Sequence, residues 1–431
     1  MHQPSLHRPV QDGTICFTDL STLKPAGRLA VPPSVGEAVP SLCAHPGEEH
    51  TLFAAAGSCV LELDLRAGLG PAAVRRCYAA NADEVNCVAA SAANGGWLAA
   101  ADDSGEVQVI SLAPAAGSAA AAADPPASSA AGSASVSAAA AEGGWPRPAR
   151  PAAYKTLRRG HSNIAAAAAF RPHRPWELLS GGLDSTVVKW DFSRLRPLQT
   201  WNLGGEATAS GGQLFNPPMV HCLAVPQTED RALGRLMAVA RGDGCVSLYD
   251  ADWKQPAASS SSGGSGSSRK GKAGASGKRG GAGSRQQQAA VPPGRLALLG
   301  REQGGHTAAV NCVAFFPGGP QLLSAGNDCR LLLWNLGAAQ EQHAAAAAAE
   351  AEQGEQADGG EQQGGGGSLR QGGAQQQEAA EGAAEGHALL AAEHKHARKI
   401  NWACTADVPG CSYNVFLADT GRRLTALALK P

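Results

Sequence analysis

Short runs of alternating hydrophobic and polar residues recur along the chain, each at a fixed distance after a turn-forming residue. Asp184 precedes Trp190 by six residues, and Asp328 precedes Trp334 by the same distance. The run Thr186–Trp190 between one such pair alternates in the manner of a half-buried β-strand. The pattern therefore predicts an all-β chain built from a repeated unit of a turn and a strand.

The spacing of these turns indicates the size of the repeat. They fall at positions 12, 57, 103, 184, 243, 328 and 419, and the first two intervals are 45 and 46 residues. A four-stranded propeller blade takes about 40–45 residues. Three longer intervals contain low-complexity insertions at 113–150, 254–294 and 337–390, without which they shorten to 43, 44 and 37 residues. We therefore predict a single seven-bladed β-propeller domain over residues 12–431.

A second motif precedes several of these turns. Val85-Asn86-Cys87-Val88, Val220-His221-Cys222-Leu223 and Val310-Asn311-Cys312-Val313 are closely alike, and Ile400-Asn401-Trp402-Ala403 is a looser fourth copy. Such self-similarity at a regular period is typical of repeat architectures. It supports the propeller interpretation independently of the turns.

Two repeats carry four polar or aromatic residues at matched spacing. In each, a Gly-His pair precedes the repeat, a serine lies four residues before the turn Asp, and a Trp lies six residues after it. This arrangement resembles the hydrogen-bonded tetrad of the WD-repeat family, in which a buried imidazole is linked through a hydroxyl to an indole N–H. We interpret two sets as structural tetrads rather than catalytic groups: His161, Ser180, Asp184 and Trp190, and His306, Ser324, Asp328 and Trp334.

The resemblance to the WD-repeat family extends over most of the chain outside the insertions, including Asp83–Leu112, His161–Leu198 and Gly305–Trp334. It implies a rigid protein-binding scaffold. Some relatives of this type have been proposed as substrate receptors of cullin-type ubiquitin ligases. They dock on the ligase adaptor through a Trp-Asp-x-Arg motif at the end of the third strand of a blade.

The chain contains a partial match to that docking motif. Leu63-Asp64-Leu65-Arg66 keeps the Asp and the Arg at the family's spacing, with Leu in place of Trp. The segment Trp190–Arg194 has one residue too many before its Arg. The resemblance thus implies that Asp64 and Arg66 bind a partner. The alternative is that they cap a strand and form a surface ion pair worth about 0–1 kcal/mol.

The first repeat is short at its N-terminal side. Only 11 residues precede Asp12, so we expect the third strand, Thr14–Asp19, and an outer strand near Gly27–Val31, but neither inner strand. An unpaired sheet edge would remain, which propellers usually avoid by closing the ring. The sequence therefore predicts an incomplete first blade and suggests a start that is truncated or placed too late.

The three insertions have compositions that favour disordered loops between blades. Residues 113–150 are mostly Ala, Ser, Gly and Pro. Residues 254–294 carry seven basic residues and no acid, and residues 337–390 carry nine acids against the single Arg370. The basic insertion could contact phosphates or direct nuclear import, but a solvated linker is the simpler interpretation. Because no aromatic residues alternate with its charges, nucleic acid is not an expected partner.

Composition restricts the compartment and the cofactors. The 11 cysteines form no C-x-x-C pair, and five of them, Cys43, Cys87, Cys222, Cys312 and Cys404, lie in apolar runs. Buried free thiols in a reducing compartment are the expectation, with no metal site. No window approaches the ~18 apolar residues of a membrane span, and the first residues show no secretory signal. We expect a cytoplasmic or nuclear protein without cofactors, monomeric within a complex.

No motif for catalysis is apparent, so we predict that the chain is not an enzyme. It lacks a nucleophile elbow, a Walker A loop, an H-E-x-x-H motif and a dinucleotide fingerprint. Two functions remain as hypotheses. The first is a substrate receptor of a cullin-type ubiquitin ligase. The alternative is a scaffold subunit of a ribonucleoprotein or chromatin-associated complex that uses the basic insertion.

Overall fold

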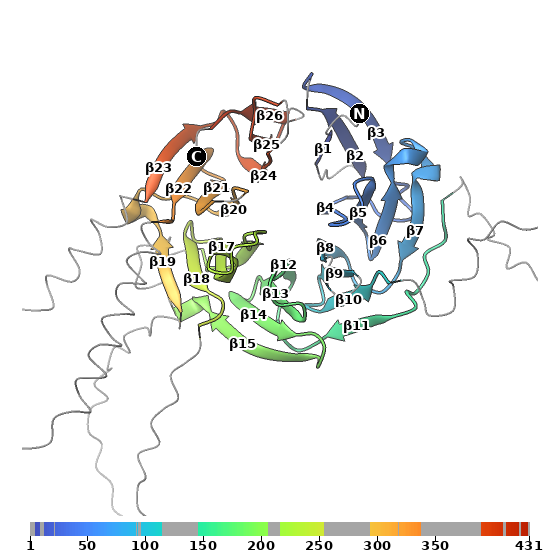
Figure 1. The fold of residues 1–431 in the computed structure, drawn as a ribbon, viewed down its shortest axis with the longest axis horizontal. Helices are drawn as coiled ribbons and strands as arrows, with labels where there is room; N and C mark the ends of the chain where they lie inside the picture. The colour runs from blue at the N-terminus through green and yellow to red at the C-terminus, as the bar shows by residue number, and fades with distance from the viewer. Residues whose placement is uncertain are drawn as a thin grey trace, which may run out of the picture.

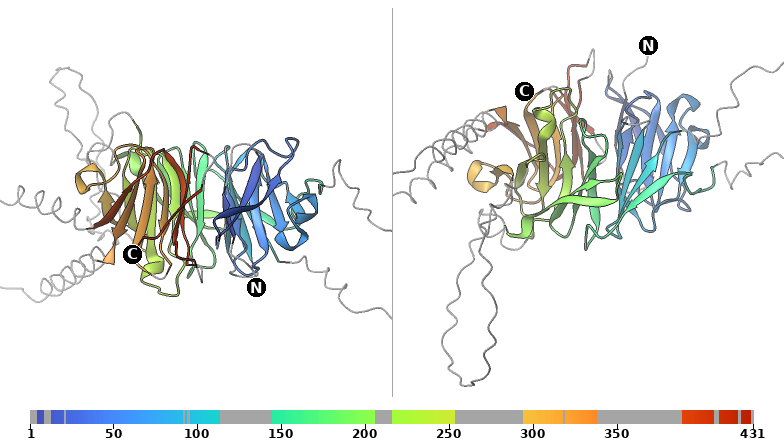
Figure 2. Two further views of the ribbon diagram at one scale, coloured as in Figure 1. Left: turned by 90° about the horizontal axis from the view of Figure 1, so that it is seen from above. Right: turned by 60° about the horizontal axis from the view of Figure 1, so that its bottom comes forward.

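The structure is a computed structural model of the full chain, and its described strands form antiparallel sheets arranged around a common centre (Figure 1). Figure 2 shows the same ring from two other sides, with the strands running across its thickness. The described residues are 5–8, 13–20, 22–91, 93, 96–113, 145–205, 216–253, 294–317, 319–337, 389–407, 411–421 and 424–429. The chain is therefore an all-β propeller, as its sequence predicts.

Seven sheets follow one another in chain order, and each is a meander in which consecutive strands pair. Two sheets have three strands: β1 (Ser5–Arg8), β2 (Thr14–Asp19) and β3 (Lys24–Ala30), and β24 (Ile400–Thr405), β25 (Val415–Asp419) and β26 (Leu424–Leu427). The other five sheets have four strands each.

The four-stranded sheets have closely similar strand lengths. The first two are β4 (Leu42–Ala44), β5 (Thr51–Ala56), β6 (Cys59–Asp64) and β7 (Val74–Tyr78), and β8 (Val85–Ser91), β9 (Trp97–Asp102), β10 (Val107–Ser111) and β11 (Tyr154–Leu157). The third is β12 (Ala165–Phe170), β13 (Glu177–Gly182), β14 (Thr186–Asp191) and β15 (Arg196–Asn202). The last two are β16 (Val220–Ala224), β17 (Leu236–Arg241), β18 (Val246–Asp250) and β19 (Arg295–Leu299), and β20 (Val310–Phe315), β21 (Gln321–Gly326), β22 (Arg330–Asn335) and β23 (Leu390–Lys395).

Single 3₁₀ turns lie in several of the connections. They include η1 (Leu65–Ala67), η2 (Pro71–Ala73), η5 (Leu203–Gly205), η6 (Leu233–Arg235) and η7 (Arg301–Gln303). One face of the ring carries the connections from first to second and from third to fourth strands. We call it the insertion face, because the described ends of all three insertions leave from third-to-fourth connections: between β10 and β11, β18 and β19, and β22 and β23.

The core lies between the sheets. Strand β5 is buried on both faces: Leu52 and Ala54 pack toward sheet β1–β3, whereas Phe53 and Ala55 pack toward sheet β8–β11. Six clusters of buried residues of this kind each join two neighbouring sheets. Alternate side chains of a strand point to opposite faces. The short apolar runs of the sequence therefore become the walls between sheets.

Among the described residues, none of these six clusters joins sheet β24–β26 to sheet β1–β3, and Figure 1 shows the ring interrupted there. The Cys411 thiol donates a hydrogen bond to the Leu20 carbonyl across this boundary, at 3.6 Å. Each of the two sheets is one strand short. The boundary is therefore the least paired part of the described ring.

The structure corrects the prediction for the first repeat. Strand β1 pairs with β2 from Ser5↔Asp19 to Arg8↔Cys16, so one of the two inner strands thought to be missing is present. The four residues of β1 do not show the alternating apolar pattern by which the other strands were identified. The first sheet has three strands rather than the expected two.

The insertions lie almost entirely outside the described residues, but two of their predicted ends are wrong. Ala149 bonds through its backbone to Cys77 and Ala79, and Trp145 is buried against sheet β4–β7. Leu389 is also buried, and Leu390 begins β23. The propeller therefore resumes at or before 145 and 389, earlier than the predicted ends at 150 and 390.

The repeated Val-Asn-Cys-Val motif acts between sheets. It lies on the first strand of a sheet, near the centre of the ring (Figure 1). Cys312 donates through its thiol to the carbonyl of Ala403 on β24, at 3.0 Å. Asn311 donates to the carbonyl of Ile400, the first residue of that strand, at 2.8 Å. Cys87 and Cys222 make longer thiol contacts of the same kind, so the motif connects neighbouring first strands.

Candidate functional site

The first predicted tetrad is assembled on sheet β12–β15. Ser180 accepts a hydrogen bond from Nε1 of Trp190 at 2.8 Å and lies 2.7 Å from Nε2 of His161. Nδ1 of His161 lies 3.3 Å from Asp184 and 3.0 Å from the Thr186 hydroxyl. His161, Ser180 and Trp190 are all buried. The four side chains thus form one chain of hydrogen bonds that links the turn to the strand.

The glycine before His161 has a packing reason. A Cβ at Gly160 would lie 2.1 Å from the Trp190 indole, closer than any side chain tolerates. Only glycine therefore lets the backbone pass over this ring. The Gly-His pair and the strand Trp are thus parts of one packing unit.

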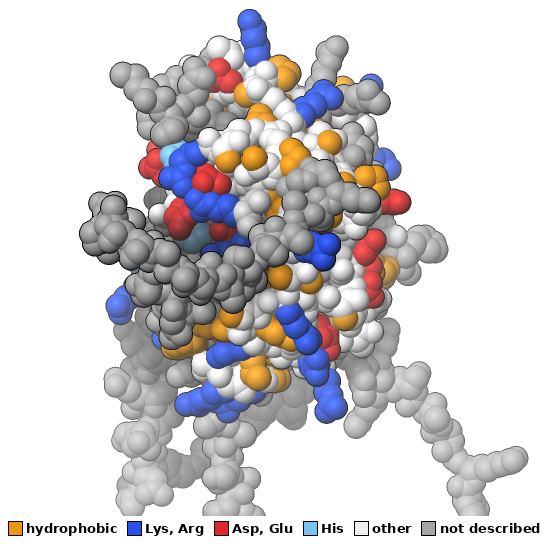
Figure 3. Space-filling view, turned by 90° about the vertical axis from the view of Figure 1, so that its right-hand side faces the viewer, with side chains coloured by type: hydrophobic (Ala, Val, Ile, Leu, Met, Phe, Trp, Pro, Cys, Tyr) orange, Lys and Arg blue, Asp and Glu red, His pale blue; other side chains and the backbone are white. Residues whose placement is uncertain are grey.

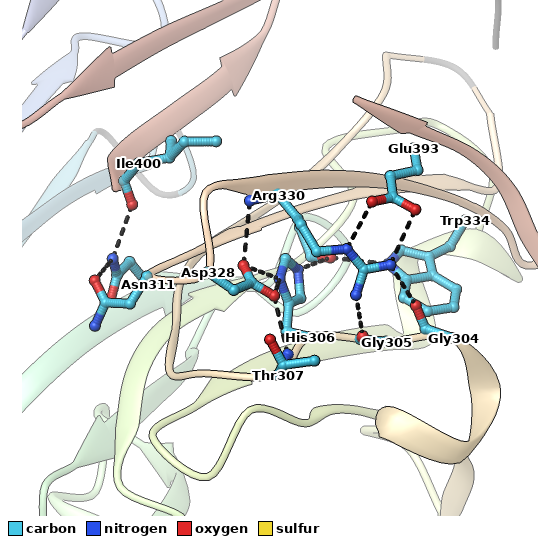
Figure 4. Close-up of polar contacts among 12 residues, drawn as sticks. Gly304, Gly305, His306, Thr307, Asn311, Asp328, Arg330, Trp334, Glu393 and Ile400 are labelled. Atoms are coloured by element: carbon cyan, nitrogen blue, oxygen red, sulfur yellow. Dashed lines mark hydrogen bonds and ion pairs between the residues drawn. The ribbon is translucent and has the colours of Figure 1, made fainter. Parts of the chain in front are cut away.

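The second tetrad lies on sheet β20–β23 and is drawn in Figure 4. Nδ1 of His306 lies 2.9 Å from Asp328, and its Nε2 lies 2.8 Å from the hydroxyl of Ser324. Nε1 of Trp334 donates to the same hydroxyl at 2.9 Å. Arg330 lies beside this group and forms a bidentate ion pair with Glu393, with Nε–Oε1 2.8 Å and Nη2–Oε2 3.1 Å.

The surroundings keep both aspartates ionised. Burial alone would raise the pKa of Asp184, but hydrogen bonds from His161, Thr186 and the Ser162 amide outweigh it and lower the pKa to about 2. The pKa of Asp328 is lowered for the same reason, chiefly by His306 acting against burial. A buried carboxylate needs such partners. These histidines therefore serve an internal network and are not presented to a ligand.

Sheet β16–β19 has a buried ion pair in place of a tetrad, and the sequence pattern did not reveal it. Arg241 and Asp243 form an ion pair whose side chains are both 0% exposed, with Nε–Oδ1 3.1 Å and a second contact of 2.5 Å. Arg241 also donates to Ser247 at 2.8 Å. The sequence did hold a sign of this ion pair. Asp243 lies at the turn position, but no Gly-His pair precedes its repeat to supply a histidine partner.

The turn between β9 and β10 contains Asp103, as the sequence predicts, but the fully buried aspartate is Asp102, the last residue of β9. It accepts hydrogen bonds from Asn81 at 2.8 Å and from the Ser104 hydroxyl at 2.5 Å.

The candidate docking residues lie on the insertion face, where β6 ends and η1 begins. Arg66 holds both carboxylate oxygens of Asp64, with Nε–Oδ1 2.9 Å and Nη2–Oδ2 3.0 Å. Asp64 also accepts a bond from the Arg66 amide at 3.1 Å. The side chain of Arg66 nevertheless remains 60% exposed. It is therefore fixed in position and open to a partner.

A third residue strengthens this arrangement. Arg75 on β7 lies 2.5 Å from Oδ2 of Asp64 and 3.6 Å from Glu48. The hydrogen bond from Arg66, assisted by those from Arg75, holds the pKa of the Asp64 carboxyl well below its usual range despite some burial. Asp64 in turn raises the pKa of Arg66. The pair therefore stays ionised through the physiological range.

A pocket of about 190 Å³ lies beside this pair. Its lining is mostly polar and includes both carboxylates and guanidinium groups: His45, Glu48, Thr51, Phe53, Glu62, Arg75, Arg76 and Leu112. Figure 3 shows acidic, basic and histidine side chains gathered on one side of the molecule. Arg75 belongs both to the pocket and to the Asp64 network, so the two are neighbours.

The second motif-like segment has a different geometry. In Trp190–Arg194 the extra residue leaves Nε of Arg194 3.7 Å from Asp191. The Ser193 hydroxyl instead donates a hydrogen bond to the Asp191 carboxylate, at 2.5 Å. Arg194 is therefore not held by two bonds, unlike Arg66.

The described residues contain no group of three or more His, Cys, Asp or Glu side chains placed to hold a metal ion. Within the same residues there is no helix of the length and apolar character that crossing a membrane requires.

Comparison with known proteins agrees with this architecture. The family model for the WD domain, G-beta repeat, matches residues 154–191 and 299–335, the segments that contain the two tetrads in full. Stretches of the chain are similar to a WD repeat-containing protein 53 homolog of Dictyostelium discoideum, with 24% identity over 110 residues. Others are similar to the ribosome biogenesis protein bop1 of Danio rerio, with 36% identity over 93 residues.

These matches are partial. Each covers 22% of this chain, and they span 28% of the first relative and 11% of the second. On these grounds the chain contains WD repeats, at residues 154–191 and 299–335 of an all-β propeller.

Proposed function

We propose that the chain is a non-catalytic scaffold that acts as a substrate receptor of a cullin-type ubiquitin ligase, with Asp64 and Arg66 docking on the ligase adaptor. One observation carries this proposal. The guanidinium of Arg66 is fixed by both oxygens of Asp64, yet its side chain is 60% exposed on the insertion face.

A fixed and exposed arginine suits an interface. Arginine is enriched among residues that dominate binding energy, and its planar fork can contact a carboxylate or several carbonyls at once. Ordering a long side chain on binding costs roughly 0.5–1.5 kcal/mol. Part of this ordering is already present in the free protein, because Asp64 bonds the Arg66 guanidinium and Arg75 in turn bonds Asp64.

The Leu in place of the motif's Trp does not oppose this proposal. Leu63 is fully buried between sheets β1–β3 and β4–β7. The substituted position is therefore a core position, whereas the two retained positions form the surface. Replacing Trp by Leu changes packing inside the sheet and leaves the exposed Arg66 in place.

The test is co-purification of the ligase adaptor with the tagged full chain from its own cells, comparing wild type with Arg66→Glu. We expect the variant to lose the adaptor, because the reversed charge repels Asp64 and removes the exposed guanidinium. Arg301→Glu is the matched control, since Arg301 is an exposed arginine of η7 between two sheets, on the other face. Absence of the adaptor from the wild-type sample, or equal recovery with Arg66→Glu, would contradict the proposal.

A second candidate is a scaffold in a ribonucleoprotein assembly. It is supported by the similarity to the ribosome biogenesis protein bop1 and by the seven basic residues of the 254–294 insertion. Deleting residues 254–293 distinguishes the two candidates. Loss of a ribonucleoprotein partner in this deletion, with binding unaffected by Arg66→Glu, would favour the second candidate.

The same proposal includes the number of blades and the location. We take the seven sheets as seven blades of one ring, with the two three-stranded sheets meeting at its interruption. The absence of a recognisable catalytic group in the sequence supports a non-enzymatic role, and the free thiols support the cytoplasm or nucleus. Protein partners fit the scaffold role better than nucleic acid or membrane.

A further inference from the structure

Several exposed large hydrophobic side chains belong to one sheet, β12–β15. Five such side chains are prominent among the described residues, and three of them are on this sheet: Trp176 at 40%, Leu195 at 51% and Leu198 at 41% exposure. Trp176 lies between β12 and β13, and Leu195 between β14 and β15, so both are on the insertion face. Clustered exposed apolar residues mark interaction sites more often than single ones.

Trp176 is held in place from one side. Its ring lies 5.5 Å from Phe192 and 5.9 Å from Trp97, centroid to centroid. Nζ of Lys155 lies 5.6 Å from the ring centroid, and the Trp176 carbonyl accepts the Phe192 amide at 3.0 Å. A tryptophan ordered in this way is a ready anchor, since little further ordering is needed on binding.

Leu195 has a backbone conformation that is costly for leucine. Its φ is +57°, in the left-handed region where the Cβ of an L-residue meets the following carbonyl. Glycine would fit this turn without strain, yet the leucine side chain stays 51% exposed among the described residues. Leu23 has the same conformation in the equivalent turn between β2 and β3, so what distinguishes Leu195 is that two further exposed apolar side chains belong to its sheet.

The charge around these residues is positive. Arg194 is 69% exposed, and Arg196 on β15 is exposed without an ion-pair partner among the described residues. Of the nearby carboxylates, Asp191 accepts the Ser193 hydroxyl and lies 3.7 Å from Arg194, and Glu177 is paired with Arg171 at 2.7 Å. The nearby Arg174 is neutralised by Asp252 at 3.1 Å. The surface therefore favours a negatively charged partner.

We propose that Trp176, Leu195 and Leu198, with Arg194 and Arg196 beside them, form a docking surface for an acidic segment of a partner protein that carries an aromatic or aliphatic anchor. We call it the Trp176 surface. The apolar residues receive the anchor, and the two arginines contact the acidic residues around it. It lies two sheets away from Arg66 and does not depend on the function proposed for that residue.

The first experiment selects binders from a phage-displayed library of random 12-residue peptides on the immobilised full-length chain. We expect enriched peptides to be net acidic and to contain Leu, Phe or Trp. The best peptide, labelled with a fluorophore, should bind at least tenfold more weakly to Leu195→Gly or Arg196→Glu, a difference of about 1.4 kcal/mol. Its binding to Arg66→Glu should equal that to wild type.

Leu23→Gly is a matched control. Leu23 is the fourth residue after Asp19, as Leu195 is after Asp191, and it has a φ of +55° and 39% exposure in the turn between β2 and β3. Glycine relieves the same strain in both variants, so both should unfold at or above the wild-type temperature. Only Leu195→Gly should lose the peptide, and this result cannot come from unfolding.

Three results would overturn the proposal. The first is enrichment of basic or uncharged peptides, or of none. The second is equal peptide affinity in Leu195→Gly and wild type. The third is an equal loss of affinity in Leu23→Gly, which would indicate an indirect effect. Displacement of the peptide by a synthetic copy of residues 349–388 of the chain, but not by a scrambled copy, would make the acidic insertion the occupant instead of a partner.

Discussion

Individual side chains in this propeller are used mainly to link strands and sheets. The two tetrads connect a turn to the Trp of a neighbouring strand, and Arg241 with Asp243 does so without a histidine. Removing one partner of such a buried group leaves the other unsatisfied, which costs roughly 1–3 kcal/mol or more for a charge. His161 and His306 are thus structural residues, whereas Arg66 is exposed.

Asp184 should make stability depend on pH. Its folded pKa of about 2 lies below the ordinary 3.8. Its contribution to stability is therefore fully present above about pH 4 and is lost as the pH falls toward 2, and it amounts to about 2 kcal/mol. In urea unfolding at a series of pH values, the stability difference between wild type and Asp184→Asn should shrink over this range. A difference that stays constant would show that Asp184 gains nothing from His161.

The sequence revealed the residues that recur in register and missed those that do not. His161 and His306 were recognised because four residue types repeat at one spacing. Arg241 was missed, because burial of a charge depends on neighbours from other strands and has no period along the chain. Asp102 and Asp103 are adjacent, and only the hydrogen bonds of Asn81 and Ser104 distinguish which is buried.

Strands follow the same rule. β14 and β22 were predicted because an apolar alternation ends at a Trp. β1 was not predicted, since its four residues, SLHR, carry no such pattern and pairing with β2 defines it. Trp145 and Leu389 were assigned to insertions because composition was averaged over their low-complexity neighbours.

Shortening an insertion should stabilise the propeller. The Asp250 amide donates to the Gly294 carbonyl at 2.8 Å, so the two described ends of the 254–293 segment already lie together. Replacing these residues with about four Gly and Ser residues reduces the entropy cost of loop closure, by about 2 kcal/mol for a tenfold shorter loop. Chemical unfolding measures this gain.

A Gly-Ser linker of the original length is the control for this replacement, and it should leave the free energy of unfolding unchanged. Destabilisation by the short linker would contradict the prediction. It would mean that residues 254–293 contribute packing to the ring.

At the scale of the whole ring, stability should be uneven. Each interior sheet packs on two neighbours, whereas β1–β3 and β24–β26 are joined by no buried cluster among the described residues. Opening free energy is lowest where few apolar contacts and unpaired strand edges coincide. The interruption is therefore where the ring should open first.

Hydrogen exchange followed by mass spectrometry tests this expectation. Backbone amides of β1 and β26 should exchange faster than those of β9 and β17, which are buried on both faces. Equal protection of all four strands would show that the ring is closed in solution. Because exchange is measured on the intact protein, no substitution is needed.

The placement of the insertions also makes the propeller a useful framework for protein engineering. All three interrupt a sheet between its third and fourth strands, and two of them leave from the neighbouring sheets β16–β19 and β20–β23. Encoded reporters substituted at these two junctions would be carried by adjacent, firmly packed sheets on one face. A donor and an acceptor fluorescent protein placed there would form a sensor that reads out binding on that face while leaving the strands themselves unaltered.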